Sequence, residues 1–270
     1  MGQVSGTVGR WVLSGLVVAL IGACSESASS RSSSANHQSN QANSSASIAV
    51  DTSNSLNPPT PTFKAAQQAA GFSPDGKYYI YLESSQDTGA GIPKVNLQVV
   101  DVSANACVRN GCIETRYGEA ESKLSIKDAE QDLLQQTWTL RQKLQLTSPT
   151  TGVKLPIRSR SRTADGTETI TVQLDGRQSL QLRLQQKRTT SAIAGGTAEK
   201  DQAALRLEVF DGREPRSLGS LKNFRDWVLD YSIREVYLAP NSDRVVVLVT
   251  ATKPTFEGTI GTTLVQSFEL

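Results

Sequence analysis

Residues 71–268 alternate short apolar, β-branched segments with turn signals, and this pattern limits the chain to a mainly antiparallel β fold. Pro74-Asp75-Gly76 precedes one segment and favours a turn, because proline presets φ and glycine accepts a positive φ. Asp175-Gly176 separates two others and is a strong hairpin signal. We predict about eight strands, which include residues 78–83, 95–102, 167–174, 179–186, 205–210, 227–238, 244–252 and 262–268.

Residues 124–146 change to a helical period. The apolar side chains that recur at this spacing are Ile126, Ala129, Leu133, Leu140 and Leu144. Pro149 stops the pattern, so we expect one long helix here, and residues 64–70 favour a short one. The predicted fold class is therefore α+β, mainly antiparallel β with one long helix packed on the sheet.

The N-terminus has the pattern of a bacterial export signal. Residues 11–23 are an apolar run of thirteen, too short for a bilayer, which needs about 20 residues. The run ends in Ile21-Gly22-Ala23-Cys24, which resembles the lipobox that directs acylation of the cysteine. We therefore predict a signal peptide over residues 1–23 and a lipid-anchored, palmitate-bearing Cys24. The alternative is an ordinary secretory signal cleaved after Ala23.

Residues 24–62 have the composition of a disordered linker. Thirteen of the 38 residues in 25–62 are Ser and none is aromatic, so the segment cannot bury enough apolar surface to fold. As a flexible coil it spans roughly 35 Å. Composition shifts at Phe63, and residues 63–270 are predicted to form a single β-rich secreted domain.

Charge and location restrict the partners. The net charge is +2, which argues against a nucleic-acid partner. The predicted location is the cell envelope, with the protein held on the membrane through its N-terminal lipid. Ser25 follows the cysteine, which fits the outer membrane facing the periplasm if the bacterium has two membranes.

Cys107 and Cys112 flank Asn110-Gly111, which favours a tight turn that brings the two sulfurs together. Export to an oxidising compartment favours a structural disulfide. Unpaired thiols and a redox-active pair are the alternatives, although the spacing is not Cys-x-x-Cys. The only histidine is His37 in the linker, so we expect no metal site and no cofactor.

Three further features carry weaker hypotheses. Arg158, Arg160 and Arg162 alternate, so one strand face could present them to an anionic surface, or they are simply solvated. Residues 87–91, Asp-Thr-Gly-Ala-Gly, could suggest a phosphate cradle, but a flexible hairpin loop is favoured. Glu83 and Asp87 could serve glycoside hydrolysis, although strand ends commonly carry such residues.

Several of these segments, in this order, resemble an uncharacterised family of predicted secreted bacterial proteins. The segments that carry the resemblance are residues 71–78, 86–93, 100–102 with Asn105, the helix at 124–146, 236–241 and 256–258. The resemblance implies an exported single domain and supplies no catalytic residue. From the residues we expect a non-enzymatic module that binds an envelope protein or glycan. The alternative is an envelope hydrolase or glycan-processing enzyme.

Overall fold

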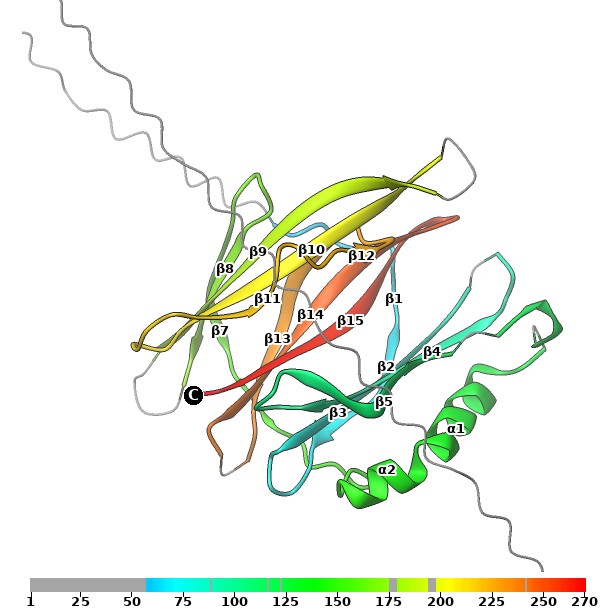
Figure 1. The fold of residues 1–270 in the computed structure, drawn as a ribbon, viewed down its shortest axis with the longest axis horizontal. Helices are drawn as coiled ribbons and strands as arrows, with labels where there is room; N and C mark the ends of the chain where they lie inside the picture. Colours follow the sequence, from blue (N-terminus) through cyan, green and yellow to red (C-terminus); the bar gives the residue numbers. More distant parts are fainter. Residues whose placement is uncertain are drawn as a thin grey trace, which may run out of the picture. The chain divides into compact units, whose positions relative to one another are not determined.

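A computed structural model describes residues 57–270 except 88, 116, 122, 175–178, 194–197 and 241. These residues belong to one compact unit, Thr52–Leu270. They form fifteen strands in three sheets, with two short α-helices and one 3₁₀ turn, Glu119–Glu121 (Figure 1). Apart from β1 on β15, every strand pair is antiparallel.

The central sheet has the order β1-β15-β14-β13-β6. Its strands are β1 (Phe63–Lys64), β15 (Gly258–Glu269), β14 (Arg244–Thr255), β13 (Asp230–Leu238) and β6 (Val153–Lys154). We call the second sheet the outer sheet, and its order is β11-β10-β9-β8-β7, with β12 paired to β10. Its strands are β11 (Arg216–Gly219), β10 (Glu199–Phe210), β9 (Ser179–Ala192), β8 (Glu168–Gln173), β7 (Ile157–Arg162) and β12 (Arg225–Asp226).

The third sheet, which we call the helix-covered sheet, has the order β2-β3-β4-β5. Its strands are β2 (Ala66–Phe72), β3 (Tyr78–Gln86), β4 (Pro93–Asp101) and β5 (Ala106–Glu114). The helices α1 (Ile126–Gln136) and α2 (Trp138–Lys143) follow β5 in the chain. Ala129 and Leu133 of α1 are fully buried and pack on this sheet.

The central sheet is buried on both faces, and β14 shows how. Val245, Val247 and Val249 pack in one core with the outer sheet. Val246 and Leu248 point the other way, into a second core with the helix-covered sheet. Because both faces need apolar side chains, the five consecutive residues are all apolar, as is typical of a fully buried strand.

The helix-covered sheet is also buried on both faces, as β3 shows. Tyr79 and Tyr81 face the central sheet, whereas Ile80 and Leu82 face the helices. The layers therefore follow in the order outer sheet, central sheet, helix-covered sheet and helices. The predicted antiparallel β architecture is confirmed, but the described residues hold fifteen strands rather than about eight.

The predicted single helix over residues 124–146 is wrong, because Thr137 divides it into α1 and α2. The Thr137 hydroxyl donates to the carbonyl oxygen of Leu133 at 2.8 Å, and such back-bonding bends or breaks a helix. The predicted helix over residues 64–70 is also wrong. Most of it lies in β2, which pairs with β3.

Candidate functional site

The predicted lipidation site lies outside the described residues. Cys24, the signal peptide over residues 1–23 and His37 all precede Asn57, where the described chain begins. Asn57 to Thr62 belong to the compact unit rather than only to a linker, since the Thr62 amide donates to the Thr259 hydroxyl at 3.1 Å. Among the residues from Asn57 onward, no helix is both long and apolar enough to cross a membrane.

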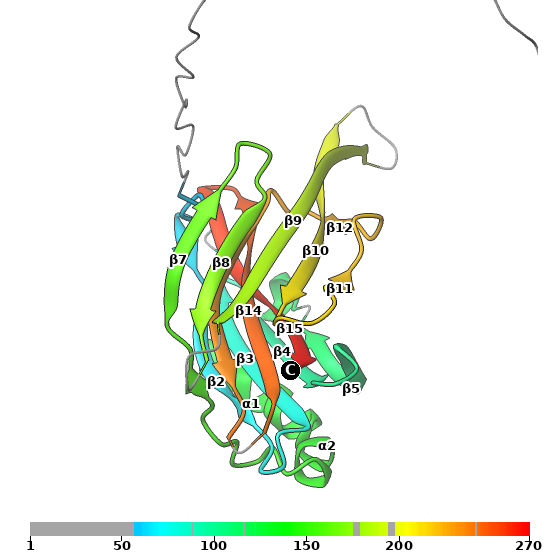
Figure 2. The ribbon, with the colours of Figure 1, turned by 90° about the vertical axis from the view of Figure 1, so that its left-hand side faces the viewer.

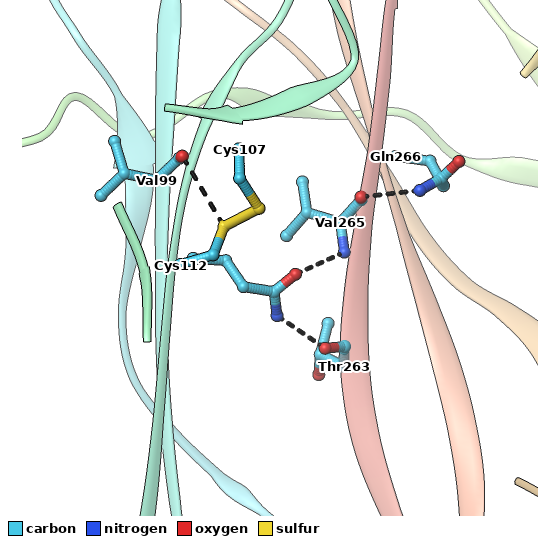
Figure 3. Close-up of a disulfide and its surroundings, with 7 residues drawn as sticks. Val99, Cys107, Cys112, Thr263, Val265 and Gln266 are labelled. Carbon is cyan, nitrogen blue, oxygen red and sulfur yellow. Dashed lines mark hydrogen bonds between the residues drawn. A yellow bond between two sulfur atoms is a disulfide. The ribbon is translucent and has the colours of Figure 1, made fainter. Parts of the chain in front are cut away.

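The predicted disulfide between Cys107 and Cys112 is confirmed, with a Cα–Cα distance of 5.7 Å (Figure 3). Cys112 lies opposite Gln98 on β4, and Cys107 lies opposite Val100. The five residue steps from Cys107 to Cys112 on β5 thus span the same length as the two steps from Val100 to Gln98 on β4. The extra residues of β5 form a bulge, and the disulfide closes it. Asn110 has a positive φ of 59°, as the turn requires. The bond thus fixes an edge strand, which is a structural role.

Side chains cap the open edge of β15 beside this disulfide (Figure 3). The Gln98 amide donates to the carbonyl oxygen of Thr263 at 2.7 Å and accepts from the amide of Val265 at 3.1 Å. The amide of Thr263 donates to the Glu83 carboxylate at 2.8 Å. The amide of Ser267 donates to Asn105 at 2.8 Å. The three outward amides between Thr263 and Ser267 are therefore bonded within the domain.

Arg158, Arg160 and Arg162 do not form the single exposed face that their spacing predicts. A bulge in β7 between Ile157 and Ser159 takes Arg158 out of the alternation and leaves it exposed. Arg160 pairs with Glu168. Arg162 is only 5% exposed and lies against the central sheet. Two of the three arginines are therefore used inside the domain.

Arg162 belongs to a buried ionic cluster between the outer and central sheets. Its guanidinium lies 2.5 Å from the Asp230 carboxylate and 3.5 Å from that of Glu168. Arg188 of β9 also binds Asp230 at 2.5 Å. Burial raises the pKa of the Glu168 and Asp230 carboxyls, and the neighbouring arginines oppose this shift. The cluster therefore joins the outer sheet, through Arg162 and Arg188, to the central sheet, through Asp230.

In the described part of the loop after β3, the amides of Gly89, Ala90 and Gly91 are bonded within the loop and are not free for a phosphate. The Asp87 carboxylate accepts from the amides of Gly89 and Ala90, at 3.1 and 3.0 Å. It also binds Lys94 at 2.7 Å, and these bonds lower the pKa of Asp87 to about 2. Glu83, the other carboxylate of the hypothetical hydrolase pair, is 2% exposed and bonded to β15.

Two hollows are the best defined in the described part of the chain. The larger, of about 380 Å³, is lined by Leu174, Asp211, Gly212, Arg213 and Leu270. Its carboxylate, Asp211, is bound by Arg213 and Arg216, each at 2.8 Å. The smaller, of about 180 Å³, lies near Asn105 and Arg225. Within the same residues, no three His, Cys, Asp or Glu side chains are grouped to hold a metal.

The most distinctive candidate is a two-stranded ribbon formed by the distal halves of β9 and β10 (Figures 1 and 2). We define the ribbon as residues 187–192 of β9 with 199–204 of β10. β8 pairs with β9 only as far as Leu184, so in the described structure residues 187–192 have β10 on one side and no strand on the other. Lys187, Arg188, Thr189 and Thr190 are all exposed.

The pairing register shows which amides face the open side. The Asp201 carbonyl accepts from the Trp227 amide at 2.7 Å, so it points away from β9. Thr190 lies opposite Asp201, and opposite residues in an antiparallel pair face toward or away from each other together. The Thr190 N–H therefore points to the open side, and by alternation so do those of Arg188 and Ala192.

The sequence gives a partial signal for this ribbon. Leu180, Leu182 and Leu184 alternate as a half-buried strand should, and the alternation then stops at Gln185. The pattern therefore predicts the strand end at Gln186, whereas β9 continues six residues further, to Ala192. The β-branched pair Thr189-Thr190 is the remaining clue that the strand continues without a core.

Comparisons with known proteins identify a family. Searches of curated proteins and of solved structures found no match. A family of predicted secreted proteins, DUF2259, matches residues 81–268, which cover most of the described domain from β3 to β15. The chain belongs to this family of predicted secreted proteins, DUF2259.

Proposed function

We propose that this protein is a lipid-anchored component of the bacterial cell envelope that acts by binding, without catalysis. Its anchor is the acylated Cys24, and its ligand is an extended segment of another envelope protein. If the bacterium has two membranes, the protein lies on the outer membrane and faces the periplasm. The open edge of the β9–β10 ribbon is the observation that carries the binding role.

An open strand edge is a template for strand addition, in which backbone hydrogen bonds supply affinity. The outward N–H groups of Arg188, Thr190 and Ala192 repeat at the spacing that a partner strand would match. The contrast with β15 supports this reading. There, Glu83, Gln98 and Asn105 bind the edge amides, whereas among the described residues no side chain binds the outward amides of the ribbon.

Natural proteins often protect such edges with charged side chains. The two charges of this segment are held by the domain itself. The Lys187 ammonium lies 5.8 Å from the centre of the Phe224 ring, and Arg188 binds Asp230 at 2.5 Å. Residues 189–192, Thr-Thr-Ser-Ala, carry no charge, so they leave the edge accessible to a partner.

The binding test uses Thr190, because its N–H faces the open side. Proline at this position removes one outward donor and leaves the bonds to β10 intact, as an edge strand tolerates. Thr190→Val is the matched control, since it keeps the N–H and the β-branched shape. A photo-crosslinking residue at Thr189 reports contact in intact cells, and the same residue at Gln135, exposed on α1, is the positional control.

We expect a defined crosslinked protein from position 189 but not from position 135. Thr190→Pro should abolish that product, whereas Thr190→Val should keep it. Near-unchanged thermal unfolding of both variants would show that the domain remains folded. A product that survives Thr190→Pro, or that forms equally at Gln135, would contradict strand addition at this edge.

A further inference from the structure

We infer that the end of the domain at which the chain enters docks on the lipid bilayer through Phe256 and Trp227. This inference rests on the proposed lipid anchor, which keeps the domain close to the membrane. It adds a second, direct contact between the folded domain and the lipid headgroup region.

The direction of β1 places the tether at this end. β1 is parallel to β15, with Phe63 opposite Ile260 and Lys64 opposite Gly261. Residues before Phe63 therefore run toward the turn that joins β14 to β15. The bond from the Thr62 amide to Thr259 continues this path. Figure 2 shows the blue start of the described chain beside the orange and red tips of β14 and β15.

Phe256 stands in that turn with 95% of its surface exposed. Of the large hydrophobic side chains that are exposed in the described residues, three lie at this end: Phe63, Trp227 and Phe256. Trp138 and Val153 lie elsewhere, on α2 and on β6 beside Leu238. An aromatic side chain held almost wholly in solvent at a hairpin tip is a candidate for contact with an apolar phase.

Trp227 gives a second, independent observation. Its φ is +58°, which is a genuine outlier for a bulky side chain. Its amide bonds Asp201 at 2.7 Å, and the Leu229 amide bonds Thr252 at 2.8 Å, so the surrounding strands hold it there. Thr252 lies opposite Gly261, which places Trp227 at the end of the sheet where β1 enters. The indole is 46% exposed, and strained residues of this kind cluster at functional sites.

The bilayer is the occupant that this chemistry favours. Tryptophan and other aromatic side chains concentrate at the membrane interface, where an apolar ring meets hydrated headgroups. Lys64 and Lys253 lie on the strands next to this turn, so two cations offset the exposed carboxylate of Glu257 in the turn and favour anionic headgroups. The tether restricts the domain to a thin layer above the membrane, which raises the effective concentration of a weak contact. The β9–β10 ribbon lies at this same end, since its residue Asp201 bonds the Trp227 amide. A partner bound to the ribbon would therefore also lie near the membrane.

Tryptophan fluorescence in vesicles with brominated lipids tests the contact. The mature chain retains only Trp138 and Trp227, because Trp11 lies in the predicted signal peptide. The full lipidated protein carrying Trp138→Phe makes Trp227 the only reporter. The Trp227→Phe protein makes Trp138 the reporter and is the matched control. Bromine quenches only at short range, so a domain that is merely tethered gives weak quenching of both.

We expect strong quenching of Trp227 and weak quenching of Trp138. Phe256→Ser should lower the quenching of Trp227 to the level of Trp138, whereas Val153→Ser at an exposed site elsewhere should not. Equal quenching of the two tryptophans would overturn the docking. Trp227 quenching that is unchanged in the Phe256→Ser variant would overturn it too. Protection of Trp227 from acrylamide without vesicles, increasing with protein concentration, would assign this end to a second copy and overturn the inference.

The anchor is measured separately by the mass of the N-terminal peptide. If Cys24 carries no lipid, the proposed anchor fails. Docking is then tested by adding excess brominated vesicles to this unlipidated protein. If the vesicles do not quench Trp227 under these conditions, the docking inference is overturned as well.

Discussion

The guanidinium of Arg162 and the carboxylate of Asp230 lie 2.5 Å apart between two sheets, with side-chain exposures of only 4% and 5%. Arg162 ends β7 in the outer sheet and Asp230 begins β13 in the central sheet. The pair therefore joins the two layers at their edge. Each charge depends on the other, because an unpaired charge at this depth would be strongly unfavourable.

Arg162→Ala should lower the free energy of unfolding by about 3 kcal/mol, because it removes the buried partner of the Asp230 carboxylate and leaves only the half-exposed Arg188 beside it. Arg158→Ala is the control, since Arg158 is exposed on the same strand and should cost less than about 0.5 kcal/mol. Denaturant unfolding of both variants measures the difference. Equal stability of the two would show that the Arg162 pair contributes nothing.

Part of the architecture follows from the sequence. The alternation in residues 78–83 and 244–252 predicts β3 and β14, because two-sided burial demands apolar residues there. Residues 66–70, which looked helical, lie in β2 because pairing with β3 outweighs their weak local preference. The disulfide follows from the Asn110-Gly111 turn and the predicted export, since the turn folds β5 back enough to bring Cys107 and Cys112 together.

The arginine alternation shows why the rest could not be predicted. The bulge at Arg158 depends on how β7 pairs with β8, and the buried partner Asp230 of Arg162 comes from β13, 68 residues away in the chain. The outward edge of β9 depends on where β8 stops pairing, which no local pattern encodes. Site features that depend on such long-range pairing need the folded structure.

The disulfide should contribute about 2 kcal/mol to stability, because it closes a short loop in the unfolded chain. Replacing Cys107 and Cys112 together with serine should lower the unfolding free energy by that amount and keep the native circular dichroism spectrum. Mass spectrometry of alkylated, unreduced protein should find neither thiol modified. Two alkylated cysteines in the exported protein would contradict the bond.

Glu83 should make the domain less stable as pH rises above about 4.5. Burial raises the pKa of this carboxyl from its ordinary value of 4.5, so the folded state binds its proton more tightly than the unfolded state. Stability from this group is therefore greatest at low pH and falls as pH rises through the folded-state pKa. Glu83→Gln removes the ionisation and keeps an oxygen for the Thr263 amide.

Unfolding free energies at a series of pH values between 4 and 8 test this. The Gln variant should show a smaller decline with pH than the wild type, and Glu114→Gln, at an exposed site in β5, should not. If the pH profiles of Glu83→Gln and wild type coincide, burial of the Glu83 charge has no cost.

Cys24→Ala should release the protein from the membrane fraction, because the acylated cysteine is the predicted anchor. Incorporation of labelled palmitate into the wild type, but not into the variant, measures the same step directly. Replacement of Cys107 and Cys112 should leave both the label and the membrane fraction unchanged. Membrane-bound, unlabelled wild type would refute the lipoprotein interpretation.

Amide hydrogen exchange along β9, resolved residue by residue, tests the central claim most directly. In the full chain alone, the amides of Arg188, Thr190 and Ala192 should exchange quickly, whereas those of Lys187, Thr189 and Ser191, which face β10, should exchange slowly. Addition of the protein captured by crosslinking at Thr189 should slow the first three and leave the others unchanged. Slow exchange at Thr190 in the free chain, or no change on addition of that protein, would contradict an edge that receives a partner strand.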